Sequence, residues 1–272
     1  MRLQVLVSTM NEANIDNLIK NMKIKSGFVV NQLTSKRAMK AQKSATNMNG
    51  YSYAGKGLSE SRNIALSKTT ADIVQIADDD LYYVRNYDKI ILAGYEKYQD
   101  ADIIAFYVDH ENPKLRAPKL PEGKIGLLKS MKIVSYQISL RPKSLRNKNI
   151  IFDENFGTGT KKIMGEESIL LFDCINAGLK IYSVPIKIAT LKDDSVSTWF
   201  KGYDAEYFRV KGMVFYRMSN ILAVPLALQF IIRKRKIYTS EITARKALSC
   251  IFHGIKLEAA LVKQNSRNMA EH

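Results

Sequence analysis

Apolar segments of strand length alternate with helical segments through the first hundred residues of the chain. Apolar, β-branched runs predict four strands, at Leu3–Thr9, Gly27–Leu33, Asp72–Ala77 and Ala101–Val108. Helical spacing and helix start signals predict helices between them, in the segments NEANIDNLIKNM, LSESRNIALSKT and NYDKIILAGYEKYQ. Such alternation is typical of an α/β fold with a mostly parallel sheet, in which ligands bind beyond the carboxyl ends of the strands.

The length of the chain excludes few classes of soluble protein, whereas its cysteines and its N-terminal segment indicate the compartment. A chain of 272 residues can form one large domain or two small ones without covalent cross-links. Cys174 and Cys250 lie 76 positions apart and match no metal-binding or disulfide-framework spacing, which favours a reducing compartment. The segment MRLQVLVSTMNE lacks the apolar region and cleavage site of a signal peptide. We therefore expect a cytoplasmic protein.

The chain is strongly basic, and the excess is concentrated near its C-terminus. The formal net charge is +16. Residues 201–272 contain 13 Lys and Arg against 5 Asp and Glu, so about a quarter of the length carries half of the excess. A polyanionic partner is indicated: nucleic acid, an anionic membrane or a phosphate-bearing substrate. Since no RNA- or DNA-binding motif is visible, we expect no nucleic-acid partner.

Three aspartates, Asp78, Asp79 and Asp80, follow an apolar, β-branched run at the predicted carboxyl end of a strand. Adjacent carboxylates repel one another unless a positive charge lies among them, and a bound cation is one way to supply it. The alternative is a polar loop in which Asp80 caps the next helix. A phosphatase of the haloacid dehalogenase type is disfavoured, because it needs Thr or Val where Tyr82 stands.

Four segments occur in an order that narrows the function. STMNE (Ser8–Glu12) follows the first strand, GLSESRNIAL (Gly57–Leu66) precedes the aspartate strand, and MGEESILLFD begins about 85 residues after the aspartates. Together with the aspartates they resemble family 2 glycosyltransferases of the GT-A fold. The resemblance implies a Rossmann-like mixed sheet flanked by helices, which we expect to fill residues 1–212, and leaves residues 213–272 as a basic, helical C-terminal extension.

The resemblance also assigns the residues that bind the nucleotide. Thr9, Asn11 and Glu12 stand at the end of strand one, where the family holds the base and ribose. Arg62 and Asn63 lie on a helix that points toward the diphosphate or the acidic motif. A planar guanidinium suits either phosphate or carboxylate, so a structural ion pair is the alternative for Arg62.

The aspartates themselves are expected to hold Mn²⁺ or Mg²⁺, hard cations that need oxygen ligands. A divalent cation stabilises the departing diphosphate as a Lewis acid. Asp80 is predicted to coordinate the metal directly. The resemblance places Asp78 nearer the ribose or a metal-bound water. Asp79 is grouped with the nucleotide site but is the most replaceable of the three, because its side chain should point away.

Two positions depart from the family pattern. Many members carry D-D-G-S after the second strand, where this chain has Asn31 and Gln32. Amides can hydrogen-bond a uracil edge, which favours UDP and leaves TDP open. Many relatives also place a metal-binding histidine in the region of Ile188–Phe200, which has none here. Asp193 or Asp194 is a candidate oxygen ligand in its place; the alternative is a solvated loop.

The predicted general base lies at the start of a later helix. Inversion at the anomeric carbon needs a base for the acceptor hydroxyl proton. Aligning Gly165 with the family motif G-E-D makes Glu167 the base and Glu166 an acceptor-orienting partner, whereas simple helix capping is the alternative. Trp199, with Phe200, is a candidate sugar-stacking platform or part of the core.

The tail contains the run ILAVPLALQFIIRKRK (Ile221–Lys236), in which twelve largely apolar residues precede four cations. It is shorter than the roughly 20 residues that span a bilayer. Two interpretations remain open: an interfacial helix on an anionic membrane, or a helix packed on the catalytic domain or on the partner of a homodimer.

The resulting prediction is a metal-dependent, inverting hexosyltransferase. Its donor would be UDP-glucose, UDP-galactose or an N-acetyl derivative. The acceptor would be a saccharide or a polyprenyl-linked saccharide in bacterial capsule or exopolysaccharide biosynthesis. The protein would be cytoplasmic, with peripheral contact to the inner face of the cell membrane as an option. The alternative is a non-catalytic basic module that binds membrane or nucleic acid.

Overall fold

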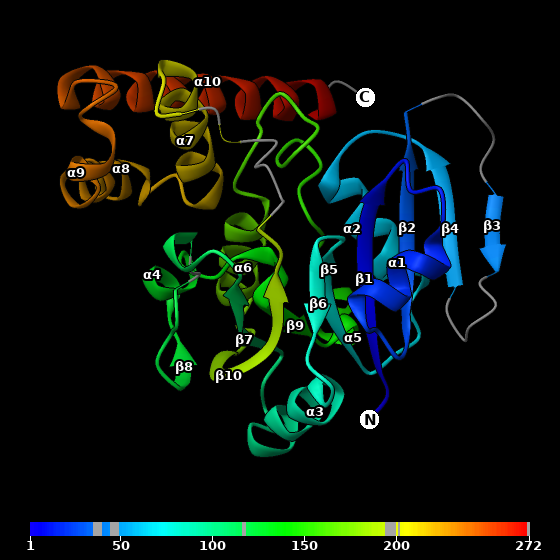
Figure 1. The fold of residues 1–272 in the computed structure, drawn as a ribbon. Helices are drawn as coiled ribbons and strands as arrows, with labels where there is room; N and C mark the ends of the chain where they lie inside the picture. Colours follow the sequence, from blue (N-terminus) through cyan, green and yellow to red (C-terminus); the bar gives the residue numbers. More distant parts are fainter. Residues whose placement is uncertain (35–39, 44–48, 116–117, 194–199, 201, 271–272) are drawn as a thin grey trace. The chain divides into compact units, whose positions relative to one another are not determined.

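The computed structural model describes residues 1–272 except 35–39, 44–48, 116–117, 194–199, 201 and 271–272 (Figure 1). The chain forms two compact units, each described below by itself. Unit 1 comprises Met1–Glu154 and Leu170–Val196, and unit 2 comprises Asn155–Ile169 and Ser197–His272. The boundary expected after residue 212 falls inside a helix, Ala205–Met218, that belongs wholly to unit 2.

Unit 1 is built on one mixed sheet. Its strands are β1 (Leu3–Met10), β2 (Gly27–Leu33), β3 (Lys40–Lys43), β4 (Asn49–Ala54), β5 (Ile73–Asp78), β6 (Leu81–Tyr83), β7 (Ile103–His110), β8 (Gly123–Ile125), β9 (Ile138–Leu140) and β10 (Ile181–Leu191). Their order is β3-β4-β2-β1-β5-β9-β7-β10-β6, and β8 pairs with β10. The longer strands β1, β2, β4, β5, β7 and β10 run parallel, whereas β3, β6, β8 and β9 are antiparallel. The predicted α/β fold with a mostly parallel sheet is confirmed.

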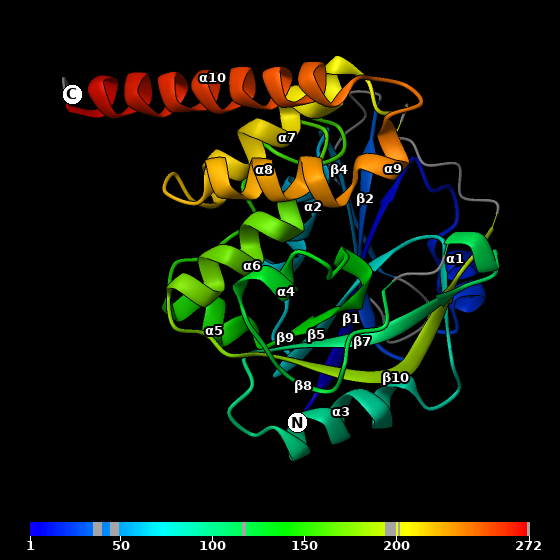
Figure 2. The same ribbon diagram turned by 90° about the vertical axis from the view of Figure 1, so that its left-hand side faces the viewer.

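Helices cover both faces of the sheet (Figures 1 and 2). They are α1 (Ile15–Met22), α2 (Leu58–Lys68), α3 (Tyr87–Lys97), α4 (Leu127–Ser130), α5 (Pro142–Asn147) and α6 (Glu166–Asn176), with short 3-10 turns η1 (Pro113–Leu115) and η2 (Ser135–Gln137). Successive strand residues point to opposite faces. Val5 and Val7 therefore pack with α1 and α3, while Leu6 packs with α2, α5 and α6. The result is a three-layer α/β/α arrangement.

Unit 2 is helical in its C-terminal part. It contains α7 (Ala205–Met218), α8 (Ala223–Arg233), α9 (Arg235–Tyr238) and α10 (Ala244–Ala270), together with the segment Asn155–Ile169. In Figure 1, α10 crosses α7, and the two helices are in contact. Two glycines permit this approach, because a Cβ on Gly212 would lie 2.0 Å from the Ile251 carbonyl oxygen and one on Gly254 would lie 1.9 Å from the Arg209 carbonyl oxygen. A backbone crossing this close admits only glycine at either position.

Among the helices that the structure describes, none combines the length and the apolar character needed to cross a membrane.

Candidate functional site

The predicted nucleotide residues of unit 1 meet at one edge of the sheet, where three parallel strands end. Thr9 of β1 pairs with Asn31 of β2, and Ser8 of β1 pairs with Asp78 of β5. Because the carboxyl ends of parallel strands lie side by side, the segments that follow them are also neighbours. The segment after β1 and the aspartates after β5 thus lie side by side within unit 1.

Asn31 fixes the turn that follows β1. Its Oδ1 accepts a hydrogen bond from the Glu12 N–H at 3.0 Å, and its Nδ2 donates to the Glu12 carbonyl at 2.8 Å. Asn11 adopts a positive φ of 54° and its Oδ1 accepts from the Thr34 N–H at 3.0 Å. Asn31 is only 1% exposed. In this structure the Asn31 side chain therefore holds the Glu12 backbone in place. Its contact with a uracil edge stays a prediction.

Gln32 is turned into the protein. Its Nε2 donates to Tyr53 Oη at 2.5 Å and to the Gly57 carbonyl at 2.6 Å, and the residue is buried. Burial raises the pKa of Tyr53 to about 12, against the hydrogen bond from Gln32, which lowers it. The Tyr53 hydroxyl also donates to Glu60 Oε2 at 3.3 Å. Gln32 thus ties β2 to β4 and to the start of α2. We keep its role toward the base as a prediction.

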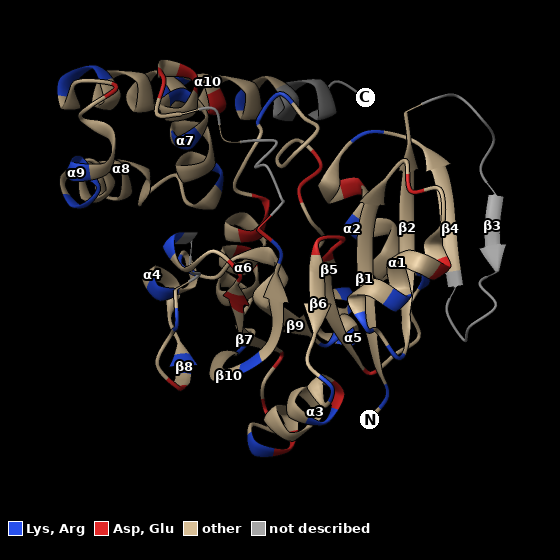
Figure 3. Ribbon diagram, viewed as in Figure 1, with Lys and Arg blue, Asp and Glu red and all other residues tan. Residues whose placement is uncertain are grey.

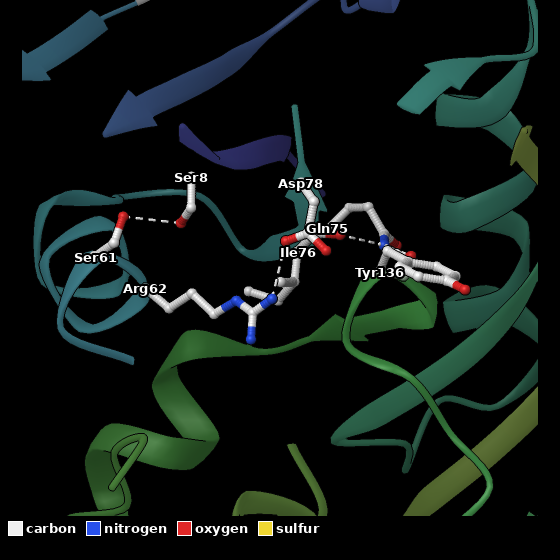
Figure 4. A network of polar contacts seen from close by, with 7 residues as sticks. All are labelled: Ser8, Ser61, Arg62, Gln75, Ile76, Asp78 and Tyr136. Carbon is white, nitrogen blue, oxygen red and sulfur yellow. Dashed lines mark hydrogen bonds and ion pairs between the residues drawn. The ribbon is translucent and has the colours of Figure 1, made fainter. Parts of the chain in front are cut away.

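The acidic run is joined to α2 by a buried arginine (Figure 4). Arg62 Nη2 donates to Asp78 Oδ1 at 2.9 Å, and its guanidinium lies 5.5 Å from the centre of the Phe152 ring. The Arg62 side chain is 1% exposed, whereas that of Asp78 is 29% exposed. Beside this pair, Ser61 Oγ donates to Ser8 Oγ at 2.9 Å. Arg62 thus reaches the acidic motif, one of its two predicted targets, and the pair agrees equally with the alternative of a structural ion pair.

Asp79 does not point away as predicted. Its Oδ2 accepts a hydrogen bond from Thr9 Oγ1 at 2.6 Å, so its carboxylate is turned toward the end of β1. Desolvation raises the pKa of Asp79, the negative charges of Asp78 and Glu12 act in the same direction, and the Thr9 hydrogen bond opposes them. The sequence alone could not show this, because strand alternation does not continue into the turn after β5.

Many relatives have a metal-binding histidine in the region of residues 188–200, and the first residues of that region lie beside the aspartates. β10 pairs antiparallel with β6, and the Lys192 N–H donates to the Asp80 carbonyl at 3.0 Å. The Asp193 N–H donates to Glu111 Oε2 at 3.1 Å. Asp194 and Trp199 lie outside the described residues, so their predicted roles stay predictions.

Asn63 is bound to a neighbouring segment of unit 1. Its Nδ2 donates to the Phe152 carbonyl and to Glu154 Oε1, both at 2.9 Å, and its Oδ1 accepts from the Phe152 N–H at 2.9 Å. These bonds fix residues 152–154 against α2. The predicted contact of Asn63 with the nucleotide is not tested by this geometry.

The described residues contain no group of three or more His, Cys, Asp or Glu side chains placed to hold a metal ion. Mg²⁺ is usually bound through one or two carboxylates together with substrate phosphates, rather than in an all-protein cage. Asp78 and Asp80 supply hard oxygen donors of that kind at the end of β5. The donor chemistry of the run therefore fits Mn²⁺ or Mg²⁺ with a diphosphate.

The predicted base lies in unit 2, at the start of α6. Gly165 has a φ of 95°, and a Cβ there would lie 2.6 Å from Val214 Cγ2. The first turn of α6 can pack this closely on α7 only because residue 165 is glycine. Glu166, directly after it, is buried, and Glu167 is half-buried.

Lys211 is a residue of this part of unit 2 that sequence reasoning missed. It lies one turn before Val214 on α7, and its Nζ is 5.6 Å from the centre of the Tyr207 ring and 5.7 Å from that of Phe230. Desolvation lowers the pKa of Lys211, while the charges of Glu167 and Glu166 raise it. Nothing in the sequence distinguishes this lysine from the other cations of the tail.

The loop before Gly165 is anchored to α10 by an ion pair that sequence reasoning also missed. Lys162 Nζ lies 2.6 Å from Glu258 Oε2, and the two side chains are 15% and 5% exposed. The same Nζ is 4.3 Å from the centre of the Phe156 ring. The Lys162 carbonyl accepts hydrogen bonds from Gly157 and Met164, both at 2.8 Å. One ion pair thus links α10 to the loop that leads into Glu166 and Glu167.

Solved structures resemble this chain throughout most of its length. Residues 1–349 of S. aureus TarS in complex with UDP-GlcNAc align with a TM-score of 0.63 and 15% identity, covering 89% of this chain and 74% of that chain. The complex of the same TarS residues with UDP aligns with a TM-score of 0.61 and 14% identity, covering 94% and 81%. No family model and no curated protein matches the sequence. The likeness confirms the GT-A fold expected from the sequence.

Proposed function

We propose that the chain is a glycosyltransferase that moves a sugar from a nucleotide-diphosphate donor to a saccharide acceptor with inversion. One observation carries the proposal: the ends of β1, β2 and β5 bring Thr9, Asn31 and Asp78 to one edge of the sheet, in a fold shared with a protein solved with UDP-GlcNAc and with UDP. Ligands of open α/β sheets bind at such an edge.

The donor is assigned to unit 1. Thr9, Asn11 and Glu12 hold the base and ribose, with Asn31 and Gln32 favouring UDP over TDP. Bound Mn²⁺ or Mg²⁺ would neutralise the diphosphate as it leaves. Asp80 and Asp78 are the residues that would hold it, and the buried Arg62 keeps Asp78 oriented. The sugar is expected to be glucose, galactose or an N-acetyl derivative of either.

The acceptor chemistry is assigned to the start of α6. Glu167 removes the proton from the acceptor hydroxyl as that oxygen attacks the anomeric carbon, and Glu166 orients the acceptor. The backbone carbonyl of Gly165 accepts from the Ile169 N–H at 2.9 Å, which begins the helix that carries both carboxylates. Trp199 is proposed to stack on a sugar ring. The acceptor is a saccharide or lipid-linked saccharide of a bacterial surface polysaccharide, reached from the cytoplasmic side of the membrane. The C-terminal tail would either contact that membrane or form a homodimer.

Calorimetry of the full chain with UDP, in the presence of Mn²⁺ and in its absence, tests the proposal. We expect UDP to bind, and to bind more tightly with the metal. A panel of nucleotide sugars, assayed for slow donor hydrolysis, then identifies the sugar. If UDP binds in neither condition while nucleic acid or vesicles do bind, the chain is a basic binding module and the proposal is wrong.

A further inference from the structure

Helix α8 is apolar on both of its faces. Ala223, Leu226, Ala227 and Ile231 are buried in unit 2. On the opposite side, large apolar residues are exposed: Ile221 at 82%, Val224 at 45%, Leu228 at 43% and Ile232 at 73%. Val224, Leu228 and Ile232 are spaced four residues apart along one stripe of α8, and Ile221 lies in the turn just before the helix. We call these four residues, with the exposed Ile237 that follows, the outer stripe.

Four exposed cations follow the outer stripe directly: Arg233, Lys234, Arg235 and Lys236. Figure 3 shows the blue of Lys and Arg gathered at α9. The sequence from residue 207 to residue 240 contains no Asp or Glu. This part of unit 2 therefore offers apolar and positive groups with no acidic residue among them, a combination that matches anionic lipid.

We propose that the outer stripe and the adjoining cations bind the surface of an anionic lipid bilayer. At 11 residues, α8 measures about 16 Å and lies in the interface rather than across it. Ile221, Leu228 and Ile232 enter the boundary between headgroups and acyl chains, and Arg233 to Lys236 lie among lipid phosphates. Each of these cations is expected to strengthen binding about fivefold at low salt.

A second copy of the chain is a less suitable occupant. A two-fold symmetric contact sets the same surface of each subunit against the other. It would bring two sets of four cations into one interface, and residues 207–240 contain no carboxylate to offset them. Charge complementarity therefore favours lipid.

Flotation with vesicles tests this proposal without measuring activity. The full chain is mixed with vesicles of phosphatidylcholine alone, or of equal parts phosphatidylcholine and phosphatidylglycerol. One variant carries Ile221→Ser and Ile232→Ser; another carries Gln at residues 233–236. Matched controls change Ile151 and Ile186, which are 60% and 51% exposed, to Ser, or place Gln at four exposed lysines of unit 1: Lys20, Lys89, Lys143 and Lys148.

We expect the full chain to bind the anionic vesicles only, and salt to weaken that binding. The Ser variant and the variant with Gln at residues 233–236 should each bind at least tenfold more weakly, and both controls should bind like the wild type. Equal losses in the four-lysine control would mean general charge attraction and would overturn the proposal, as would absent vesicle binding. Sedimentation velocity tests whether a second copy of the chain binds this surface instead. If the wild type is a dimer, does not bind vesicles, and dissociates when it carries Ile221→Ser and Ile232→Ser, the surface belongs to a second copy. UDP affinity measured on every variant checks folding and keeps this result separate from the proposed activity.

Discussion

The buried pair between Lys162 and Glu258 gives the sharpest prediction for stability. Glu258→Leu leaves the Lys162 ammonium in a pocket where it is 15% exposed, and removing one member of a buried pair costs about 3–5 kcal/mol. The neighbouring Phe156 ring, 4.3 Å from the ammonium, offsets only about 1 kcal/mol of this. We expect Glu258→Leu to destabilise unit 2 by about 3 kcal/mol.

The double variant Lys162→Met with Glu258→Leu should recover most of that loss, because two apolar side chains of similar volume can replace a buried ion pair. Urea unfolding gives the free energies, and hydrogen exchange of residues 155–169 reports on the loop itself. Glu122→Gln serves as the control, since it breaks a pair of similar length whose side chains are 58% and 44% exposed, and little change is expected. A double variant as unstable as the sum of its parts would refute the reasoning.

The remaining predictions concern the site. Asp80→Asn should abolish the part of UDP affinity that depends on Mn²⁺, because an amide carries no net charge to offset the cation; calorimetry that finds this part unchanged in a folded variant removes Asp80 from the metal site. Glu167→Gln should lower turnover by about 10² to 10⁴ with donor affinity retained, the usual contribution of a general base. Glu166→Gln should mainly raise the acceptor KM. If it lowers turnover more than Glu167→Gln does, Glu166 is the base and Glu167 orients the acceptor. For Lys211, whose pKa is lowered on folding, the unfolded chain binds the proton more tightly, so stability rises with pH between the folded-state pKa and the ordinary value near 10.5; Lys211→Met should remove that rise in urea titrations across alkaline pH. Burial raises the pKa of Cys174 to about 12, so native protein at pH 8 should resist thiol labelling at Cys174 until it is unfolded, and fast labelling there would show that α6 opens.

The local pattern of apolar residues was enough to predict β1, β2 and α1, which lie at or beside the predicted nucleotide site. β2 has the predicted bounds, and β1 differs by one residue. The apolar spacing of Ile15, Leu18, Ile19 and Met22 gave the buried face of α1. β4 was missed, because NGYSYA combines turn-forming Asn and Gly with only alternate aromatics. Side-chain partners were also beyond reach. Gln32 bonds Tyr53 of that missed strand, so its amide could not be assigned from sequence.

In unit 2, the residues that hold the segment of the proposed base come from distant parts of the chain. Lys162 and Glu258 are separated by 96 positions. In a tail with 13 cations and 5 acids, neither Glu258 nor Lys211 differs from a residue on a solvated helix face. Such pairings depend on how α7 and α10 cross, and helical spacing within one helix does not specify the crossing of two.

Because unit 2 is assembled from two separated stretches of chain, synthesis imposes an order on it. Lys162, Glu166 and Glu167 emerge from the ribosome long before Glu258. At about 5–20 residues per second, the loop waits about 5–20 s for its anchor on α10. The strands proposed to bind the donor, β1, β2 and β5, are complete much earlier. Under the proposed function, a nascent or truncated chain would therefore gain the groups proposed to hold a nucleotide sugar before it gains a fixed general base, and would bind the donor without transferring its sugar.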